Sequence, residues 1–270
     1  MIVGQKQTLS LINTLIEQHK FPRTLLLVGH KGCGKHLLTQ YIATRLNVPM
    51  FDISDKISLS TIESIYTCSE IRLYIINTSD LDERKQNILL KFLEEPMENT
   101  YIVMTCENPN YLLNTIVNRC YTITCDLYTQ EELSVFLDKD GLTEEDIKFI
   151  LDTCKTPGQL KNVNGKKLKD LSTLTGKIIK SMSKANFSNA LTLATKLNYK
   201  DEYDKFDIDI FLSSMAKELV NQFNNSSDIK LYQMYKNTID TQKCLNRFNL
   251  NKQYVIENYI SKLWHIAHEV

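Results

Sequence analysis

A glycine-rich segment near the start of the chain has the residues needed to hold phosphate groups. It reads GHKGCGKH from Gly29 to His36, which is the pattern G-x-x-x-x-G-K. Glycines let the backbone curl so that its N–H groups converge on phosphate oxygens, and the lysine of this pattern reaches the outer phosphates of a nucleotide. The segment therefore predicts a nucleotide-binding loop whose candidate residues are Gly29, Gly32, Cys33, Gly34, Lys35 and His36.

The residue after the lysine departs from the usual pattern. A serine or threonine normally stands there, because its hydroxyl holds the Mg²⁺ that accompanies ATP. In this chain the residue is His36, and imidazole is a poor ligand for a hard cation that prefers oxygen. The loop predicts that ATP can bind, while the placement of Mg²⁺ is left open.

A second segment bears on hydrolysis. P-loop ATPases hold Mg²⁺ with an aspartate at the end of a neighbouring strand, and in many of them a glutamate follows to polarise the attacking water. Here Asn77 and Thr78 stand at these two places, and Asp80 is a weak substitute three residues further on. An amide supplies no negative charge and a threonine cannot act as a base. We therefore expect the isolated chain to hydrolyse ATP poorly or not at all.

The elements around these residues alternate between strand and helix. Short apolar runs predict strands at 23–28, 48–53, 72–77, 101–105 and 121–125, and helical periodicity predicts helices at 5–19, 35–46, 60–67, 82–95 and 111–117. Strands that are apolar almost throughout indicate a parallel sheet covered by helices on both faces. The phosphate loop would then lie in the first turn from a strand to a helix, which is where such loops occur.

The pattern changes near residue 126, after which every segment reads as helix. Helices are predicted at 130–137, 144–154 and 158–163, and longer ones follow. The last is the clearest, because Ile256, Ile260, Leu263 and Ala267 share one helical face. The predicted fold class is an α/β P-loop domain with a parallel sheet, followed by small helices and an all-helical C-terminal domain.

Composition limits the function classes. The 270 residues include 32 basic and 32 acidic side chains, so the formal charge is zero. Binding of nucleic acid by bulk electrostatics usually needs a basic surplus, so a nucleic-acid role would depend on a local patch or on partners. The seven cysteines form no C-x-x-C pair, which argues against a disulfide scaffold and a zinc ribbon and favours a reducing cytoplasm. No apolar run is long enough to predict a membrane span.

Several segments match one family. The chain resembles the clamp-loader AAA+ subunits of DNA replication, and among them the delta-prime type of bacterial DNA polymerase III. The stretch QNILLKFLEEP, residues 86–96, carries the most specific likeness. The other matching segments are Val3-Gly4-Gln5, Glu107-Asn108-Pro109, TIVNRC at 115–120, Gly158-Gln-Leu-Lys161, Asn249-Leu250-Asn251 and Leu263-Trp264.

The resemblance implies an architecture and a role. It implies an AAA+ core at 1–126, a helical lid at 127–175 and a collar at 176–270 through which five subunits form a ring. It implies partners as well: other clamp-loader subunits, the sliding clamp, and primer–template DNA reached through the complex. The delta-prime type acts mainly as a stator. Site roles also follow from the likeness: Val3 and Gly4 near adenine, Lys161 at the second sensor in place of an arginine, and Arg119 as an arginine finger for the neighbouring subunit's ATP.

Departures from the family keep other readings open. Asn118 replaces the usual serine, and the zinc module of bacterial relatives is absent, which would suit a divergent or phage-type clamp loader. One alternative is an ATP-hydrolysing motor subunit with a degenerate metal site, and another is an AAA+ adaptor in repair. The sequence also leaves open whether ATP meets Lys35, which subunits are the partners, and whether the chain touches DNA directly.

Overall fold

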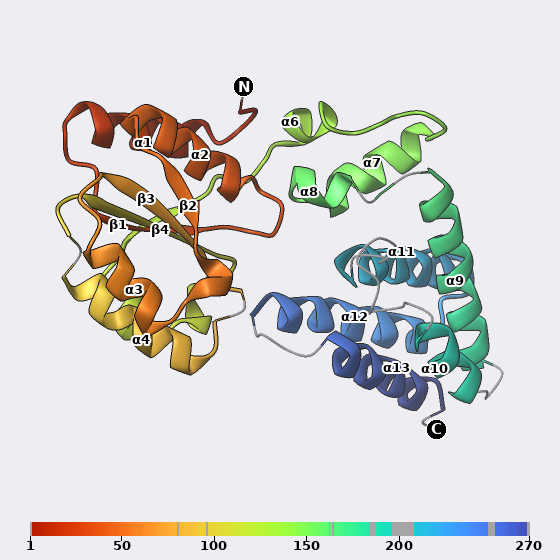
Figure 1. The fold of residues 1–270 in the computed structure, drawn as a ribbon. Helices are drawn as coiled ribbons and strands as arrows, with labels where there is room; N and C mark the ends of the chain where they lie inside the picture. The colour runs from red at the N-terminus through yellow and green to blue at the C-terminus, as the bar shows by residue number, and fades with distance from the viewer. Residues whose placement is uncertain are drawn as a thin grey trace. The chain divides into compact units, whose positions relative to one another are not determined.

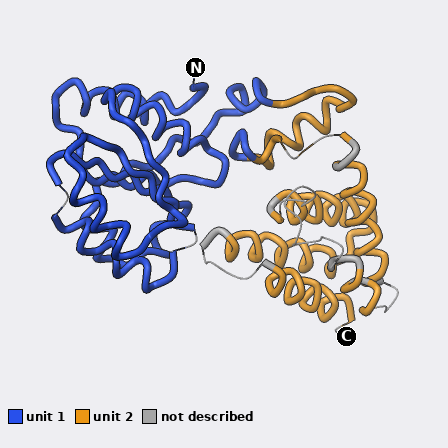
Figure 2. Tube along the Cα trace, viewed as in Figure 1, with its two compact units in different colours: residues 1–136, 155–158 blue, residues 137–154, 159–270 orange. Residues whose placement is uncertain are grey.

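The computed structural model describes residues 2–79, 81–95, 97–161, 163, 165–183, 187–195, 208–247 and 252–268. These residues form two compact units (Figure 2), the first built from residues 1–136 and 155–158 and the second from residues 137–154 and 159–270. The division of the chain into a core, a lid and a collar at residues 126 and 175 stays a prediction, because the two compact units do not test it.

The first unit is built on a parallel sheet of five strands, in the spatial order β2-β3-β4-β1-β5. Strand β1, Thr24–Val28, lies between β4 and β5. Leu25, Leu26 and Leu27 are all fully buried, because alternate side chains point to opposite faces and both faces are covered. The other strands are β2 (Met50–Asp52), β3 (Arg72–Asn77), β4 (Thr100–Cys106) and β5 (Tyr121–Thr124).

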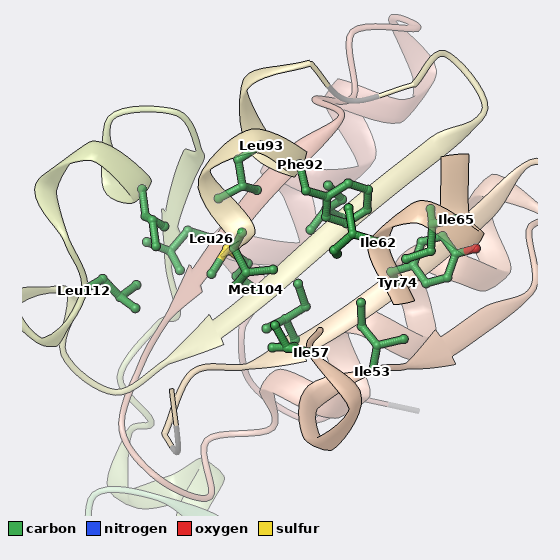
Figure 3. Packing of buried hydrophobic residues seen from close by; sticks show 14 of the residues in the cluster. Leu26, Ile53, Ile57, Ile62, Ile65, Tyr74, Phe92, Leu93, Met104 and Leu112 are labelled. Carbon is green, nitrogen blue, oxygen red and sulfur yellow. The ribbon is translucent and has the colours of Figure 1, made fainter. Parts of the chain in front are cut away.

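Helices cover the two faces of the sheet in pairs, α1 with α2 and α3 with α4 (Figure 1). Leu25 and Leu27 pack in a cluster with Ile12 of α1 and Leu38 of α2. On the other face Leu26 joins Phe92 of α4, in the cluster drawn in Figure 3. The helices are α1 (Lys6–Glu17), α2 (Lys35–Leu46), α3 (Leu59–Tyr66) and α4 (Glu83–Glu94).

The predicted helix at 111–117 is shorter in the structure. A 3₁₀ turn, η2, spans Pro109–Tyr111 and is capped by Asn108, whose side chain accepts from the N–H of Asn110. Leu112 and Leu113 are then extended, so that helix α5 covers Asn114–Val117 alone. The helix is interrupted because Leu112 is buried in the apolar cluster that contains Leu26 and Phe92. An extended backbone at Leu112 places the Leu112 side chain among these residues. Helix α6, Gln130–Ser134, is also shorter than predicted.

The second unit consists of helices in the residues that the structure describes. Helix α11 packs against α12 and α9, and α13 packs against α12 and α10. Ile256, Ile260 and Leu263 of α13 are buried, as the spacing predicted. The fully buried Tyr259 hydroxyl lies 2.8 Å from the Thr238 hydroxyl, which satisfies both groups. The helices are α7 (Glu144–Thr153), α9 (Gly165–Ser183), α10 (Phe187–Thr195), α11 (Ile208–Ser226), α12 (Ile229–Arg247) and α13 (Lys252–His268).

The structure confirms the predicted fold class, a parallel α/β P-loop domain followed by an all-helical region. Most predicted elements coincide with observed ones, and the predicted span of α2, residues 35–46, is the observed span. Among the described helices, none combines the length and the apolar character that crossing a membrane requires.

Phe92 is expected to be a main stabilising residue of the first unit. Its ring is fully buried and lies edge-on to Tyr66 and Tyr74, with ring centroids 6.0 and 6.5 Å away. Truncation leaves a cavity, so Phe92→Ala should lower the free energy of unfolding by about 3–5 kcal/mol, measured by urea denaturation. Leu59→Ala, at a position 64% exposed, is the control and should change stability by less than about 0.5 kcal/mol. Equal effects of the two substitutions would contradict this account of the core.

Candidate nucleotide-binding site

The glycine-rich loop joins the end of β1 to the start of α2, as predicted. Gly32 and Gly34 have φ values of 79° and 95°, in the left-handed region that glycine adopts without strain. Gly34 is also the residue that caps the N-terminus of α2. The loop therefore ends at the positive pole of a twelve-residue helix, where anions bind favourably.

The Lys35 side chain folds back over its own loop. Its Nζ donates to the carbonyl oxygen of Gly29 at 2.6 Å and to that of His30 at 3.0 Å. These two bonds hold the ammonium at the mouth of the loop. A phosphate oxygen is a stronger acceptor than a carbonyl because it is charged, so the ammonium can exchange one carbonyl for a phosphate.

The N-terminal segment, which holds Val3 and Gly4, lies against this loop. The Gln5 side-chain amide donates to the carbonyl oxygen of Asp126 and accepts from the N–H of Asp126, at 2.8 Å each. Its Nε2 also lies 3.5 Å from the carbonyl oxygen of Cys33. The Asp126 carboxylate accepts from the N–H groups of Gln7 and Thr8 at the start of α1. An anion there is favourable for the helix dipole, so Asp126 ties the segment that holds Val3 and Gly4 to the end of β5.

Tyr128 connects the same segment to the phosphate loop, and nothing in the sequence pattern pointed to it. Its hydroxyl donates to the carbonyl oxygen of Cys33 at 3.0 Å. A Cβ on Gly4 would meet the Tyr128 ring at 2.7 Å, so the ring packs directly on the Gly4 backbone. Tyr128 thus packs between the N-terminal segment and the loop.

A second missed contact comes from residues 155–158, far along the chain. The N–H of Gly158 donates to the carbonyl oxygen of Gly32 at 3.1 Å, and the Thr156 hydroxyl donates to that of Lys31 at 2.8 Å. A Cβ on Gly158 would lie 2.5 Å from the Cα of Gly32, which real atoms do not tolerate. The two glycines therefore allow a backbone-to-backbone contact that fixes the phosphate loop from outside. The short helix α8, Pro157–Leu160, starts at this contact.

Cys33 has an unusual environment inside the loop. A hydrogen bond with the Cys125 thiol, the charge of Lys35 and the N–H groups of the loop together lower the pKa of Cys33 to about 7, although burial opposes this. Gly29 leaves room for both sulfur atoms, since a Cβ there would lie 2.8 Å from one and 3.2 Å from the other. The Cys125 thiol contributes most to the lowered pKa of Cys33, and Lys35 and the loop N–H groups, which would also face a phosphate, contribute the rest.

The positions that would hold Mg²⁺ carry no carboxylate in this chain. His36 is exposed, and its Nε2 lies 3.1 Å from Nε2 of Gln40. The Asn77 Oδ1 accepts from the N–H and hydroxyl of Ser79, and the Thr78 hydroxyl donates to the carbonyl oxygen of Thr105. The residues present therefore fit the phosphates of a nucleotide better than they fit Mg²⁺. Asp80 lies outside the described residues.

Arg119 lies away from the loop, just after α5. Its Nη2 is 2.5 Å from Oε1 of Glu94 and its Nη1 donates to the carbonyl oxygen of Thr115 at 2.7 Å. The side chain is 34% exposed, so part of the guanidinium faces outward. Lys161 is exposed in the second unit, one residue after α8. Pro96 and Asn249–Asn251, which contribute to the sequence resemblance, lie outside the described residues.

A parallel sheet with the glycine-rich loop in the turn after β1, followed by helices, defines a domain of the P-loop class. Comparison with known proteins narrows this class. Residues 50–127 match the family model described as DNA polymerase III, delta subunit. This stretch runs from β2 to just beyond β5 and includes the α4 segment and Arg119.

The chain is also similar to curated proteins. It is 38% identical over 80 residues to DNA polymerase III subunit delta' of Bacillus subtilis (strain 168), which is 29% of this chain and 23% of that protein. It is 25% identical over 170 residues to DNA polymerase III subunit gamma of Buchnera aphidicola subsp. Acyrthosiphon pisum (strain APS), 50% of this chain and 47% of that protein. The chain thus covers less than half the length of either relative. The matches support a divergent member of the clamp-loader family of DNA polymerase III subunits.

Among solved structures, a gamma subunit-related DNA polymerase III protein from Thermotoga maritima aligns with a TM-score of 0.47 and 14% identity. The alignment covers 95% of this chain and 99% of that protein.

The glycine contact should be sensitive to one added methyl group. Gly158→Ala should lower the free energy of unfolding by about 1–3 kcal/mol, because the new Cβ would overlap the Gly32 backbone. Gly176→Ala is the matched control, since a Cβ there meets nothing within 4 Å inside helix α9. It should raise stability by about 0.5–1 kcal/mol. Unfolding in urea measures both, and equal signs would refute the contact.

The acidity of Cys33 can be measured directly. The ultraviolet absorbance of thiolate should show one group titrating near pH 7 in the wild type, below the value of about 8.5 for a free cysteine. This step should be missing in Cys33→Ser. In Cys125→Ala the step should move to higher pH, because the largest contribution to the lowered pKa is lost. A Cys33 titration above pH 8.5 in the wild type would rule out this electrostatic account.

Proposed function

We propose that this chain is a delta-prime-like, mostly non-hydrolysing stator subunit of a cytoplasmic complex that loads DNA sliding clamps. The observation that carries the proposal is a pair of features in one domain. The phosphate loop is intact, yet the positions that would hold Mg²⁺ and polarise water carry His36, Asn77 and Thr78. Arg119, distant from the loop in sequence, is 34% exposed and pairs with Glu94, and its remaining N–H donors would serve a neighbouring subunit.

The chain's own site is suited to binding rather than to chemistry. Lys35, the loop glycines and the start of α2 offer a cation, N–H groups and a helix pole to phosphates. Hydrolysis needs a base and a well-placed metal ion in addition, and Asn77 and Thr78 supply neither. Bound ATP would therefore serve to stabilise the domain, with the adenine near Val3, Gly4 and Tyr128. Lys161, which stands at the second-sensor position in place of an arginine, would contact the nucleotide as well.

Arg119 acts on the neighbouring subunit in this proposal. Guanidinium is planar and permanently charged, so it stabilises the negative charge that develops on a phosphoryl group during transfer. It takes no proton and leaves no covalent product. The catalytic contribution of this chain to clamp loading would then be electrostatic and made in trans.

The rest of the chain would serve to assemble the clamp-loader complex. The helices at 176–270 would form the collar of a pentameric ring, and residues 127–175 would form the lid. The other subunits of the ring would be DNA polymerase III clamp-loader subunits, and primer–template DNA and the sliding clamp would be reached through the ring. The zero net charge of the chain agrees with contacts made mainly to proteins.

A motor subunit is the second candidate, favoured by the complete G-x-x-x-x-G-K pattern with Lys35 in place. A motor would turn over ATP by itself, and Lys35→Ala would abolish that turnover. A stator would show no turnover that depends on Lys35, while still binding a fluorescent ADP analogue. The isolated full chain, assayed with and without Mg²⁺, distinguishes the two candidates.

Arg119→Ala tests the stator function in a reconstituted complex. The substitution should lower the DNA-stimulated ATPase of the complex by about tenfold or more, because one neighbouring site loses its arginine finger. Assembly measured by size-exclusion chromatography should not change, since the side chain is on the surface. Arg45→Ala is a matched control: Arg45 is 36% exposed and pairs with Glu17, much as Arg119 pairs with Glu94. If the two variants have the same ATPase activity, the finger role is wrong.

A further inference from the structure

The last residue of helix α4, Glu94, stands where a carboxylate is unfavourable. The C-terminus of a helix carries a partial negative charge from its free carbonyl groups, so an anion there lowers stability unless a cation compensates it. Helix α4 packs on the sheet through its buried residues, among them Phe92 and Leu93. This packing does not explain why the negatively charged Glu94 stands at the end of the helix.

Arg119 supplies the compensating cation. Its Nη2 lies 2.5 Å from Oε1 of Glu94, across 25 residues of sequence. Its Nη1 donates to the carbonyl oxygen of Thr115, in the neighbouring helix α5. Two different nitrogens of one guanidinium are therefore held by residues of two different helices.

The backbone beneath the side chain is held as well. The carbonyl oxygen of Arg119 accepts from the hydroxyl of Thr24 at 2.7 Å, and Thr24 begins strand β1. The N–H of Arg119 donates to the carbonyl oxygen of Ile116. Because the base of the side chain and two of its tip nitrogens are fixed, few rotamers remain. A guanidinium has five N–H donors, so donors remain for a further acceptor.

From this arrangement we propose that Glu94 is a positioning residue, which holds the Arg119 guanidinium in one ordered orientation before the neighbouring subunit's nucleotide meets it. The inference rests on the arginine-finger function proposed above. Pre-ordering removes an entropic cost that a long, free side chain would otherwise meet in each cycle. Glu94 touches no substrate itself.

The size of the effect follows from exposure. The side chains of Glu94 and Arg119 are 49% and 34% exposed, so water screens their attraction. Pairs of this kind are weak, and losing one corresponds to a change of about twofold to fivefold. Glu94→Gln should therefore lower the kcat of the complex by about twofold to fivefold and leave its KM for ATP unchanged, because the interaction acts at the transition state.

The experiment is a double-mutant cycle in the reconstituted complex. Glu94→Gln, Arg119→Ala and the double variant are compared with Glu95→Gln, which removes the neighbouring carboxylate at the same helix end. Glu95→Gln should leave kcat unchanged. Glu94→Gln should lower kcat in the wild-type background and have no effect in the Arg119→Ala background, where there is no guanidinium to position. Glu94→Asp, which keeps the charge on a shorter side chain, should restore part of the loss.

A second measurement needs no partner. In the isolated full chain, ¹⁵N relaxation of the Arg119 Nε–Hε group reports how ordered the side chain is. The order parameter should be lower in Glu94→Gln than in the wild type or Glu95→Gln.

The outcomes separate the two claims. If Arg119→Ala lowers ATPase while Glu94→Gln behaves like Glu95→Gln, the positioning role is overturned and the finger function stands. If Arg119→Ala changes nothing, the finger function fails and the positioning role fails with it. A higher kcat in Glu94→Gln would mean that the carboxylate restrains Arg119 instead of presenting it, and would also overturn the inference. Unchanged order of Nε–Hε would do so without reference to activity.

Discussion

Burial of strand β1 on both faces is the constraint on which the rest of the first unit depends. Leu25, Leu26 and Leu27 are fully buried, two toward α1 and α2 and one toward α4. Both neighbours of β1, β4 and β5, are parallel to it, so every backbone group of the strand can be satisfied within the sheet. A strand held in this way is a rigid support, and each end of β1 lies next to a candidate functional group.

The phosphate loop follows the carboxyl end of β1, and Arg119 is tied to its amino end through Thr24. In the function proposed above, the domain would receive a nucleotide at one end and offer a cation at the other, and so stand between two neighbours in a ring. In this chain the two ends of β1 differ in how complete their sites are. The end with the glycine-rich loop has its glycines and lysine but carries no carboxylate at the candidate metal positions, whereas the Arg119 guanidinium at the other end contacts residues of two helices. A site without metal-binding carboxylates, together with an ordered arginine, favours a subunit that would act on a neighbour's nucleotide and not on its own.

Much of this could be predicted from local pattern. Apolar runs of strand length and helical spacing predicted the sheet and most helices, because both periodicities follow directly from backbone geometry. Helix α5 was predicted too long, since Pro109 with Asn108 forms a separate turn and Leu112 is drawn into the core. The contacts of Tyr128 and Thr156 with the phosphate loop span 95 and 125 residues, and nothing in their local sequence signals a partner so far away.

The sequence by itself determined the candidate chemistry of this protein: a glycine-rich loop of the phosphate-binding pattern, other residues at the usual metal-binding positions, and a candidate arginine. These depend on residue type and spacing, which are visible in one dimension. The tertiary structure decided which groups act together. It placed Tyr128 and Gly158 on the loop, lowered the pKa of Cys33 by surrounding it with donors, and joined Arg119 to Glu94. Such pairings arise when packing of the whole sheet brings distant segments within a few ångströms, and no local pattern records that packing.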